Sequence, residues 1–394
     1  MPSSIEIFLE KIKRVRQLAF RSGKLYHSAH SMHSVPRKTL LLRLSSIGDI
    51  VLSTPLVRNL RKTFPEMQVD FLVKSQYAEL VRYNPYLSGI IEVDPGGGFR
   101  GLSGVGRRIR DERYDLVIDL HGNIRSVYLR SFCHADRVLK IDKRKFARWM
   151  LVRFKKNFYN GIVSVADRYF EPLAELGVGN DGEGLDVFVP ESIIRDVWVR
   201  LNEYGFRESK RIIGFCPAAK HATKIWPKER FVELGRLLVE ERQARIVVFG
   251  SKDDEAHCSE IAGSIQASLR SSLVNRRQGR NRKEWELATS LAGRCSVLET
   301  AAVMDYCAAV VTNDTGLMHI AAARKRPVVA VFGSTVEDFG FFPYGTRSVV
   351  MERRGLYCRP CTHIGLPKCP KSHFRCMKEI SVSDISRALE TFLA

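Results

Sequence analysis

Asp49 has the residue type and the position that acid–base chemistry needs. It follows an apolar run at residues 39–44, which is typical of a buried strand, and the turn Ser45-Ser46-Ile47-Gly48. A helix is predicted to start at this turn, so Asp49 would lie at the carboxyl edge of a parallel sheet, where ligands of α/β sheets bind. A carboxylate near a helix N-terminus is favoured in its ionised form and can accept a proton, although capping the helix would be an equally ordinary role.

A second candidate segment combines lysines with a hydroxyl. Lys220, Thr223 and Lys224 follow the predicted strand at residues 211–215 and precede a helix that begins at Pro227. Charged donors just before a helix suit a diphosphate, but a solvated loop uses the same residue types.

A third candidate is the turn that follows the predicted strand at residues 310–312. The backbone N–H groups of Thr315 and Gly316, with the Thr315 hydroxyl, could bind a phosphate at the start of the next helix. Alternatively, Asp314 or Thr315 only caps that helix. His319, one turn further on, is expected to pack against these residues rather than to act as a catalyst.

The elements that must position these side chains alternate between strands and helices. This alternation predicts an α/β protein with parallel sheets, and its restart near residue 211 predicts a second domain. The other predicted strands lie at residues 69–73, 90–93, 116–120, 245–249 and 328–332, and a helix is predicted at residues 55–64. Outside this alternation we expect a basic amphipathic helix at residues 4–20, an exposed insertion at residues 270–283 and a last helix at residues 383–393.

The composition agrees with two domains and an anionic partner. The chain has 394 residues, 45% of them hydrophobic, which is enough for two sizeable cores. Its formal net charge of +20 suits nucleic acid, an acidic membrane or a phosphorylated substrate. No run approaches the roughly 18 to 20 apolar residues of a membrane-spanning helix, so we expect a cytoplasmic protein.

In their order and spacing these segments resemble the lipopolysaccharide heptosyltransferases of glycosyltransferase family 9, from about residue 39 to the C-terminus. The motifs that carry the resemblance are Gly48-Asp49 with Pro55, Lys224-Ile-Trp-Pro227, Leu291-Ala-Gly293, Asp314-Thr-Gly-Leu-Met-His319 and Pro327-Val-Val-Ala-Val-Phe-Gly-Ser-Thr335. The resemblance implies a GT-B fold, in which two Rossmann-like domains with parallel sheets face each other across a cleft. With the boundaries that the alternation and composition predict, this gives a basic N-terminal extension at 1–36, an acceptor domain at 37–190, a linker at 191–210, a nucleotide-sugar domain at 211–356, and a cysteine-rich loop with a final helix at 357–394.

The resemblance also implies roles for individual residues. Asp49 would be the general base of an inverting transferase that requires no metal. The donor, ADP-heptose, would be bound by Lys224, Thr223, Asp314, Thr315, Gly316 and Ser46, with Asp254 or Glu255 toward the ribose and Cys295 toward the adenine. The acceptor would be the phosphorylated Kdo-lipid A inner core, extended by heptose.

Basic residues between the strands are candidate contacts to that polyanionic acceptor. They are Arg125, Lys140, Lys143, Arg144 and Arg148. A solubilising basic helix face would have the same composition. The helix at residues 4–20 is similarly open to two interpretations, an anchor on the anionic inner face of the inner membrane or a helix that docks on the protein's own core.

Three other functions compete with this interpretation. A non-catalytic polyanion-binding protein would explain the charge but not the placement of Asp49 and Lys224 at successive strand ends. We expect no nucleic-acid partner, because no RNA-binding signature with interleaved aromatic residues is present. A family 9 transferase that uses another nucleotide sugar remains an alternative. A Rossmann dehydrogenase or epimerase is disfavoured, since no Gly-x-Gly-x-x-Gly follows a predicted strand and the glycines at residues 101–106 have the wrong spacing and are predicted to lie in a loop.

Four of the nine cysteines cluster near the C-terminus. Cys358, Cys361, Cys369 and Cys376, together with His373, have a spacing that is compatible with a structural zinc site. Reduced thiols in a mobile loop over the cleft would have the same spacing.

Metal analysis distinguishes these two hypotheses. If the cluster binds zinc, protein purified without added zinc should contain about one equivalent of the metal. Mass spectrometry of the acid-digested protein measures this content, and a value well below one equivalent would remove the zinc hypothesis.

Overall fold

The computed structural model describes residues 35–206, 211–274 and 287–393. The predicted amphipathic helix at residues 4–20 lies outside these ranges. Residues 37–394 form one unit by their internal contacts. No helix of the described residues is both long enough and apolar enough to cross a membrane.

The first sheet has five parallel strands in the order β3-β2-β1-β4-β5. Its strands are β1 (Lys38–Leu42), β2 (Gln68–Lys74), β3 (Gly89–Val93), β4 (Leu116–Asp119) and β5 (Arg137–Lys140). β1 is the central strand, and its three leucines are fully buried because helices cover both faces of the sheet. In the register of the sheet, Leu41 lies opposite Phe71 on β2 and Ile118 on β4. Four of the strands were predicted, but β5 was not, because its alternating basic and apolar residues leave it only partly buried.

Helices connect these strands. The first two, α2 (Ile47–Leu52) and α3 (Thr54–Thr63), follow β1, and α3 buries Leu56, Val57 and Leu60 against the sheet. The others are α4 (Glu79–Arg82), α5 (Gly98–Asp111), α6 (Ile124–Arg130), α7 (Lys145–Phe154) and α8 (Val165–Arg168), with 3₁₀ helices at Ser75–Tyr77, Pro95–Gly97 and Glu171–Leu176. The predicted loop at residues 101–106 is wrong, since these residues lie within α5.

The second sheet has six parallel strands in the order β11-β10-β9-β6-β7-β8. Its strands are β6 (Arg211–Cys216), β7 (Ala244–Val248), β8 (Ala288–Ser290), β9 (Ala309–Asn313), β10 (Val328–Phe332) and β11 (Ser348–Glu352). The two outermost strands were not predicted. β8 is only three residues long and mostly small or polar, and β11 is a partly exposed edge strand, so neither has the apolar run that marks the central strands.

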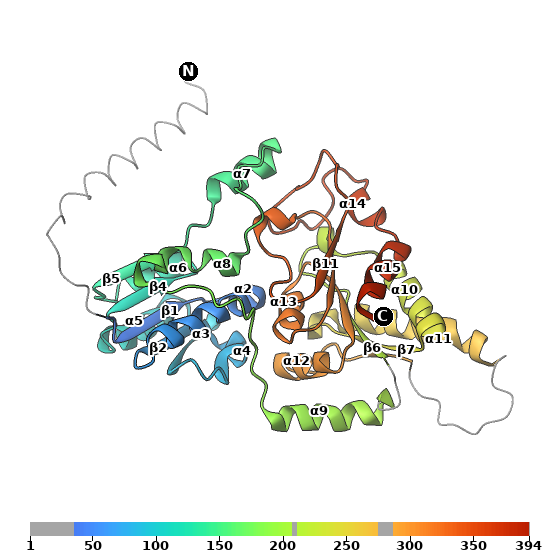
Figure 1. Cartoon of the computed structure of the whole chain (residues 1–394), viewed down its shortest axis with the longest axis horizontal. Helices are drawn as coiled ribbons and strands as arrows, with labels where there is room; N and C mark the ends of the chain where they lie inside the picture. Colours follow the sequence, from blue (N-terminus) through green and yellow to red (C-terminus); the bar gives the residue numbers. More distant parts are fainter. Residues whose placement is uncertain (1–34, 207–210, 275–286, 394) are drawn as a thin grey trace, which may run out of the picture. The chain divides into compact units, whose positions relative to one another are not determined.

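The helices of this half are α9 (Glu191–Glu203), α10 (Lys228–Arg242), α11 (Glu255–Val274), α12 (Val297–Asp305), α13 (Gly316–Ala323), α14 (Arg375–Lys378) and α15 (Val382–Leu393), with 3₁₀ helices at Ala222–Lys224, Lys252–Asp254 and Glu337–Phe339. The predicted last helix is therefore confirmed as α15, and it packs on the second sheet and α10. The predicted insertion is wrong for residues 270–274, which continue α11, and the rest of it, residues 275–283, lies outside the described residues. In Figure 1, α2 and α13 meet between the two sheets.

Two glycines in neighbouring helices provide a matched test of this packing. A Cβ at Gly235 of α10 would lie 2.4 Å from Cδ1 of the fully buried Ile265 of α11, whereas a Cβ at Gly263 of α11 would meet no atom within 4 Å. We expect Gly235→Ala to lower the free energy of unfolding by about 1–3 kcal/mol through overpacking. Gly263→Ala should raise it by about 0.5–1 kcal/mol, because alanine loses less backbone entropy in a helix. Urea denaturation measures both, and equal effects of the two substitutions would contradict the packing described here.

Candidate active site

A cavity of about 580 Å³ lies between the carboxyl ends of the two sheets. One wall comes from the first half of the chain, through the end of β1, the start of α2 and residues 141–169. The facing wall comes from the second half, through Lys224, the start of α13 and the loop after β10. Residues His363 and Ile364 of the cysteine-rich segment complete the lining.

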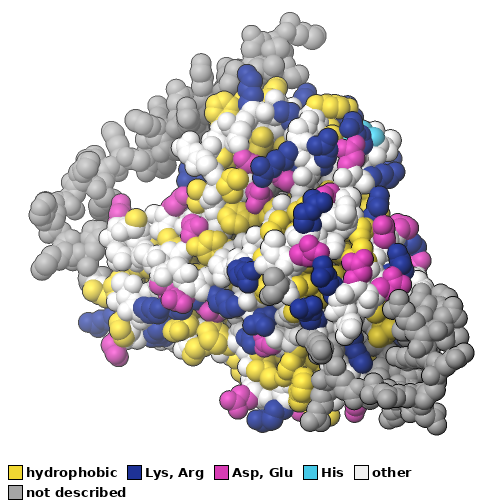
Figure 2. Space-filling model, turned by 45° about the vertical axis from the view of Figure 1, so that its right-hand side comes forward, with side chains coloured by type: hydrophobic (Ala, Val, Ile, Leu, Met, Phe, Trp, Pro, Cys, Tyr) yellow, Lys and Arg dark blue, Asp and Glu magenta, His cyan; other side chains and the backbone are white. Residues whose placement is uncertain are grey.

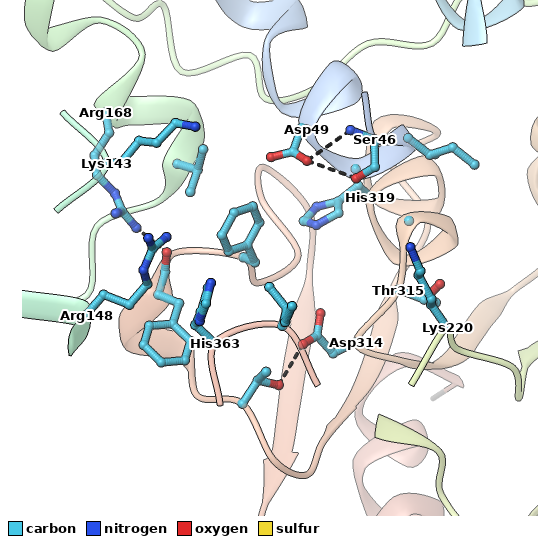
Figure 3. A pocket seen from close by; sticks show the side chains of 18 of the residues that line it. Ser46, Asp49, Lys143, Arg148, Arg168, Lys220, Asp314, Thr315, His319 and His363 are labelled. Atoms are coloured by element: carbon cyan, nitrogen blue, oxygen red, sulfur yellow. Dashed lines mark hydrogen bonds between the residues drawn. The ribbon is translucent and has the colours of Figure 1, made fainter. Parts of the chain in front are cut away.

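Asp49 lies on this cavity, at the third position of α2. Its Oδ2 accepts hydrogen bonds from the backbone N–H of Ser46 at 3.1 Å and from the Ser46 hydroxyl at 2.9 Å, and its Oδ1 forms an ion pair with Arg43. Its side chain retains 19% exposure. Asp49 therefore contributes to the start of its helix and also faces the cavity, so the two roles considered from the sequence are compatible (Figure 3).

The charge state of Asp49 follows from these neighbours. Burial alone would raise the pKa of the carboxyl group, but the Arg43 guanidinium and the Ser46 donors outweigh burial and lower the pKa below 3.8. Asp49 is therefore ionised at neutral pH and free to accept a proton. The sequence pointed to the helix N-terminus as the cause, and the structure adds the Arg43 guanidinium and the Ser46 donors.

The starts of α2 and α13 approach each other so closely that two positions exclude a side chain. A Cβ at Gly48 would lie 2.6 Å from Cδ2 of His319, and a Cβ at Gly316 would lie 2.9 Å from Cβ of Ile47. This contact holds Asp49 and the start of α13 at one cavity. His319 is buried, and burial lowers its pKa to about 4, so its imidazole is neutral at physiological pH.

Lys224 and Asp314, both expected to bind the donor, are paired with each other. Lys224 Nζ lies 2.7 Å from Asp314 Oδ2, which also accepts a hydrogen bond from Thr335 Oγ1 at 2.7 Å. Asp314 is nearly buried, whereas the Lys224 side chain retains 15% exposure. The carboxylate therefore holds the ammonium group at the cavity wall.

Thr315 and Gly316 lie where α13 begins. Thr315 is the N-cap residue, in an extended conformation, and its side chain makes no capping hydrogen bond in the structure. Both residues line the cavity beside Lys224. An anion in this part of the cavity would meet a helix N-terminus and an ammonium group together.

The opposite wall is strongly basic. Lys143, Arg148 and Arg168 lie there, while Lys220 lies on the side of Thr315 (Figure 3). Among the described residues, Lys143, Arg148 and Lys220 form no ion pair with a carboxylate. The three carboxylates that line the cavity are already paired, Asp49 with Arg43, Asp142 with Arg144 and Asp314 with Lys224. The cavity thus has an excess of positive charge and can accept an anionic ligand.

The structure does not bring every predicted residue to this cavity. Thr223 is buried, and its hydroxyl bonds to the backbone of Leu366 and to Ser334, so it holds the cysteine-rich segment in place. Asp254, Glu255 and Cys295 do not line the cavity, although they follow β7 and β8 at the same edge of the sheet.

Three of the predicted acceptor contacts also lie away from the cavity lining. Arg125 is exposed at the start of α6, and Lys140 is exposed at the end of β5. Arg144 is paired with Glu171 at 2.7 Å and Asp142 at 3.3 Å. Lys143 and Arg148 alone among the predicted basic contacts line the cavity.

Sequence reasoning gave no role to several residues that line the cavity, notably Arg43, Tyr159, Arg168 and His363. The role of Arg43 could have been inferred from the sequence, since it is the one charged residue in the apolar run at residues 39–44 that leads to Asp49. Arg168 had none, because its place depends on residues far along the chain: its guanidinium donates to the backbone carbonyl of Phe339.

The cysteine cluster shows no ready metal site in the described part of the chain, where no group of three or more His, Cys, Asp or Glu side chains could hold an ion. All four thiols are free, and the Cys358 Sγ lies 3.7 Å from His373 Nε2. Burial raises the pKa of the Cys361 and Cys376 thiols to about 11, so they are protonated in the absence of metal. Zinc binding stays a prediction.

Comparisons with known proteins agree with this geometry. The model of glycosyltransferase family 9 (heptosyltransferase) matches residues 103–369. The lipooligosaccharide heptosyltransferase 2 of Haemophilus influenzae is 28% identical over 310 residues, which cover 76% of this chain and 84% of that protein.

Two solved structures share the fold. A glycosyltransferase of family 9 from Veillonella parvula has a TM-score of 0.70 at 23% identity, covering 93% of this chain and 99% of the other. The Escherichia coli ADP-heptose lipopolysaccharide heptosyltransferase II has a TM-score of 0.63 at 23% identity, covering 90% and 98%. The predicted GT-B arrangement of two Rossmann-like halves is therefore confirmed.

The pairing of Arg43 with Asp49 predicts how the Asp49 carboxyl titrates. In Arg43→Met the burial of Asp49 is no longer opposed by the guanidinium, so the pKa of Asp49 should rise above its wild-type value. Arg43→Lys retains the charge and should raise it less. Carboxyl ¹³C NMR titration measures the pKa, with Asp49→Asn identifying the resonance. Lys220→Met, which removes a cation that does not touch Asp49, is the control, and an equal rise in this variant would contradict the assigned cause.

Proposed function

Because this chain belongs to glycosyltransferase family 9, we propose that it is an inverting heptosyltransferase. In this proposal it transfers a heptose from ADP-heptose to the Kdo/heptose inner core of lipopolysaccharide, with inversion at the anomeric carbon. The chain is a glycosyltransferase of the heptosyltransferase family. The observation that supports inverting transfer from ADP-heptose is that Asp49, Lys224 and the start of α13 line one cavity between the two sheets.

The choice of substrates is supported by the names of similar proteins and by the charge of the cavity. The Escherichia coli enzyme that shares the fold is an ADP-heptose lipopolysaccharide heptosyltransferase, and the Haemophilus influenzae relative is a lipooligosaccharide heptosyltransferase. A nucleoside diphosphate sugar and a phosphorylated glycolipid are both anionic, so the lysines and arginines of the cavity would attract them.

Asp49 is the general base in this proposal. It is ionised and faces the cavity, so it can take the proton of an acceptor hydroxyl while the hydroxyl oxygen attacks the anomeric carbon. The bond from that carbon to the ADP oxygen breaks as the new glycosidic bond forms on the opposite face. A single displacement of this kind inverts the anomeric centre, and Ser46 and Arg43 orient the carboxylate.

Lys224 and the N–H groups at the start of α13 stabilise the diphosphate as it leaves. Negative charge grows on ADP during the displacement, and a fixed ammonium group beside a helix N-terminus is placed to meet it. Asp314 would repel a diphosphate, so its role is to position Lys224. With these groups supplying the positive charge, we propose that the transfer requires no metal ion.

The acceptor would approach along the basic wall of the first half. Lys143 and Arg148 carry cationic groups without carboxylate partners among the described residues, and a phosphorylated Kdo-lipid A core offers several anionic groups. Because that acceptor is held in a membrane by its acyl chains, we propose a cytoplasmic protein bound peripherally to the inner face of the inner membrane.

Transfer assays test the proposal. Wild-type protein should transfer heptose from ADP-heptose to one of three Kdo-lipid A acceptors that carry zero, one or two heptoses, with EDTA present, and mass spectrometry of the product identifies which. Asp49→Ala should lower turnover about 10²–10⁴-fold, since the general base is lost, while calorimetry finds donor binding retained.

Asp384→Ala is the matched control for the role of Asp49 at its helix start. Asp384 lies in the first turn of α15, accepts a hydrogen bond from the Ser381 hydroxyl at 2.6 Å and does not line the cavity. This variant should keep wild-type turnover. Transfer to none of the three acceptors would refute the heptose proposal, and near-normal turnover of Asp49→Ala would refute the assignment of the base.

A further inference from the structure

The segment at residues 143–166 has an unusual composition. It contains seven lysines and arginines and no aspartate or glutamate. Elsewhere the charges are mixed: on the face drawn in Figure 2, basic and acidic side chains are interspersed, and pairs such as Lys228 with Glu260 form between them. Among the described residues, Lys145, Arg153 and Lys156 of this segment form no ion pair.

The same segment exposes large apolar side chains. Phe146 is 64% exposed and Trp149 is 51% exposed, although both belong to the helix α7, which buries only Ala147 and Leu151. Together with four further apolar and four basic side chains of the same segment they form what we call the α7 surface, in which ring contacts join the four aromatic residues. Its apolar members are Phe146, Trp149, Phe154, Phe158, Ile162 and Val163, and its basic members are Lys145, Arg153, Lys155 and Lys156.

Ring contacts and backbone contacts fix the α7 surface in place. Phe146 lies 5.8 Å from Phe158 and Trp149 lies 5.1 Å from Phe154, between ring centroids. Lys155 Nζ donates to the carbonyl of Pro360 at 2.6 Å, which ties the end of α7 to the cysteine-rich segment. Contacts between the rings therefore join α7 to Phe158, which lies in the irregular segment that follows the helix, and the four aromatic side chains stay exposed as one group.

The α7 surface continues directly into the cavity. Arg148, between Ala147 and Trp149 on α7, lines the cavity, and so does Tyr159, the neighbour of Phe158. Figure 1 shows α7 standing away from the strands of the first sheet. A ligand whose polar part reaches Asp49 would thus have its apolar part beside these rings.

Aromatic rings interleaved with lysines and arginines, and no acidic residue, suit the interface of an anionic bilayer. Tryptophan and phenylalanine insert at the level of the headgroups, and the basic side chains extend to the lipid phosphates. A two-fold contact between two copies of this chain would oppose like charges. Single-stranded nucleic acid would need open ring faces for stacking, whereas in the T-shaped pair of Trp149 and Phe154 the edge of one ring lies against the face of the other.

We propose that the α7 surface is the membrane-docking site of this protein, and that it binds anionic phospholipid with the cavity opening beside the headgroup layer. The site is separate from the N-terminal extension, which lies outside the described residues. Lipid binding by this surface is independent of the sugar transferred, whereas its effect on catalysis rests on the proposed function.

Vesicle flotation of the full-length protein tests the docking. Wild-type protein should float with phosphatidylethanolamine vesicles that contain phosphatidylglycerol, and much less with pure phosphatidylcholine. Trp149→Ser/Phe154→Ser should weaken binding at least about tenfold, because two inserting rings are lost. Lys145→Gln/Arg153→Gln/Lys156→Gln should weaken it about 100-fold at low salt, since each of the three basic residues near an anionic surface adds about fivefold.

The matched control replaces exposed side chains outside the α7 surface. Tyr83→Ser/Val199→Ser removes two apolar groups of similar exposure, 48% and 58%, and should leave flotation unchanged. Circular dichroism monitors folding, and the charge variant serves as the test if the serine variant fails to fold. Wild-type protein that does not float, or unchanged flotation of both α7 variants, would overturn the proposal. So would loss of self-association or of RNA binding, rather than lipid binding, in the α7 variants.

An activity measurement separates docking from catalysis. Trp149→Ser/Phe154→Ser should transfer sugar to an acceptor embedded in anionic vesicles at least about tenfold more slowly than wild type, in line with its weaker binding. With a deacylated, water-soluble acceptor it should equal wild type. If no sugar is transferred by any variant but flotation behaves as described, the proposed function fails while the docking site stands.

Discussion

The close approach of two short helices is the contact on which the arrangement of this enzyme depends. Gly48 at the start of α2 and Gly316 at the start of α13 leave no room for a Cβ, because His319 and Ile47 occupy the space. The two glycines allow the carboxyl edges of two separate parallel sheets to meet. Each edge brings its own groups, a carboxylate from the first half and a helix N-terminus from the second.

Two ion pairs then set the electrostatics of that meeting point. Arg43 keeps Asp49 ionised although it is largely buried, and Asp314 keeps Lys224 at the cavity wall. In each pair one member faces the cavity and the other holds it in position. All three carboxylates of the cavity, those of Asp49, Asp142 and Asp314, are paired with arginine or lysine, so the cations that have no carboxylate partner in the described part of the chain leave the cavity with an excess of positive charge.

The basic residues between β5 and α8 are not a uniform solubilising surface. Arg148 turns into the cavity, Arg144 pairs with Glu171, and Lys145 remains in solvent beside exposed aromatic rings. One stretch of sequence thus divides into a cavity wall, a structural pair and an exposed surface. Side-chain direction on a short helix decides this division, and composition alone does not reveal it.

The sequence by itself determined the α/β class and the central strands, because short apolar runs such as residues 39–44, alternating with amphipathic helices, suit strands that are buried on both faces of a parallel sheet. It also determined that Asp49, Lys224 and Asp314 follow strand ends, since that depends on local order along the chain. Only the tertiary structure decided which of these residues share a cavity, that Lys224 pairs with Asp314, and that Thr223 supports a neighbouring loop instead. It likewise decided the places of Arg168 and of the edge strands β8 and β11. These depend on contacts between residues far apart in the chain, which leave no periodic signal in the sequence.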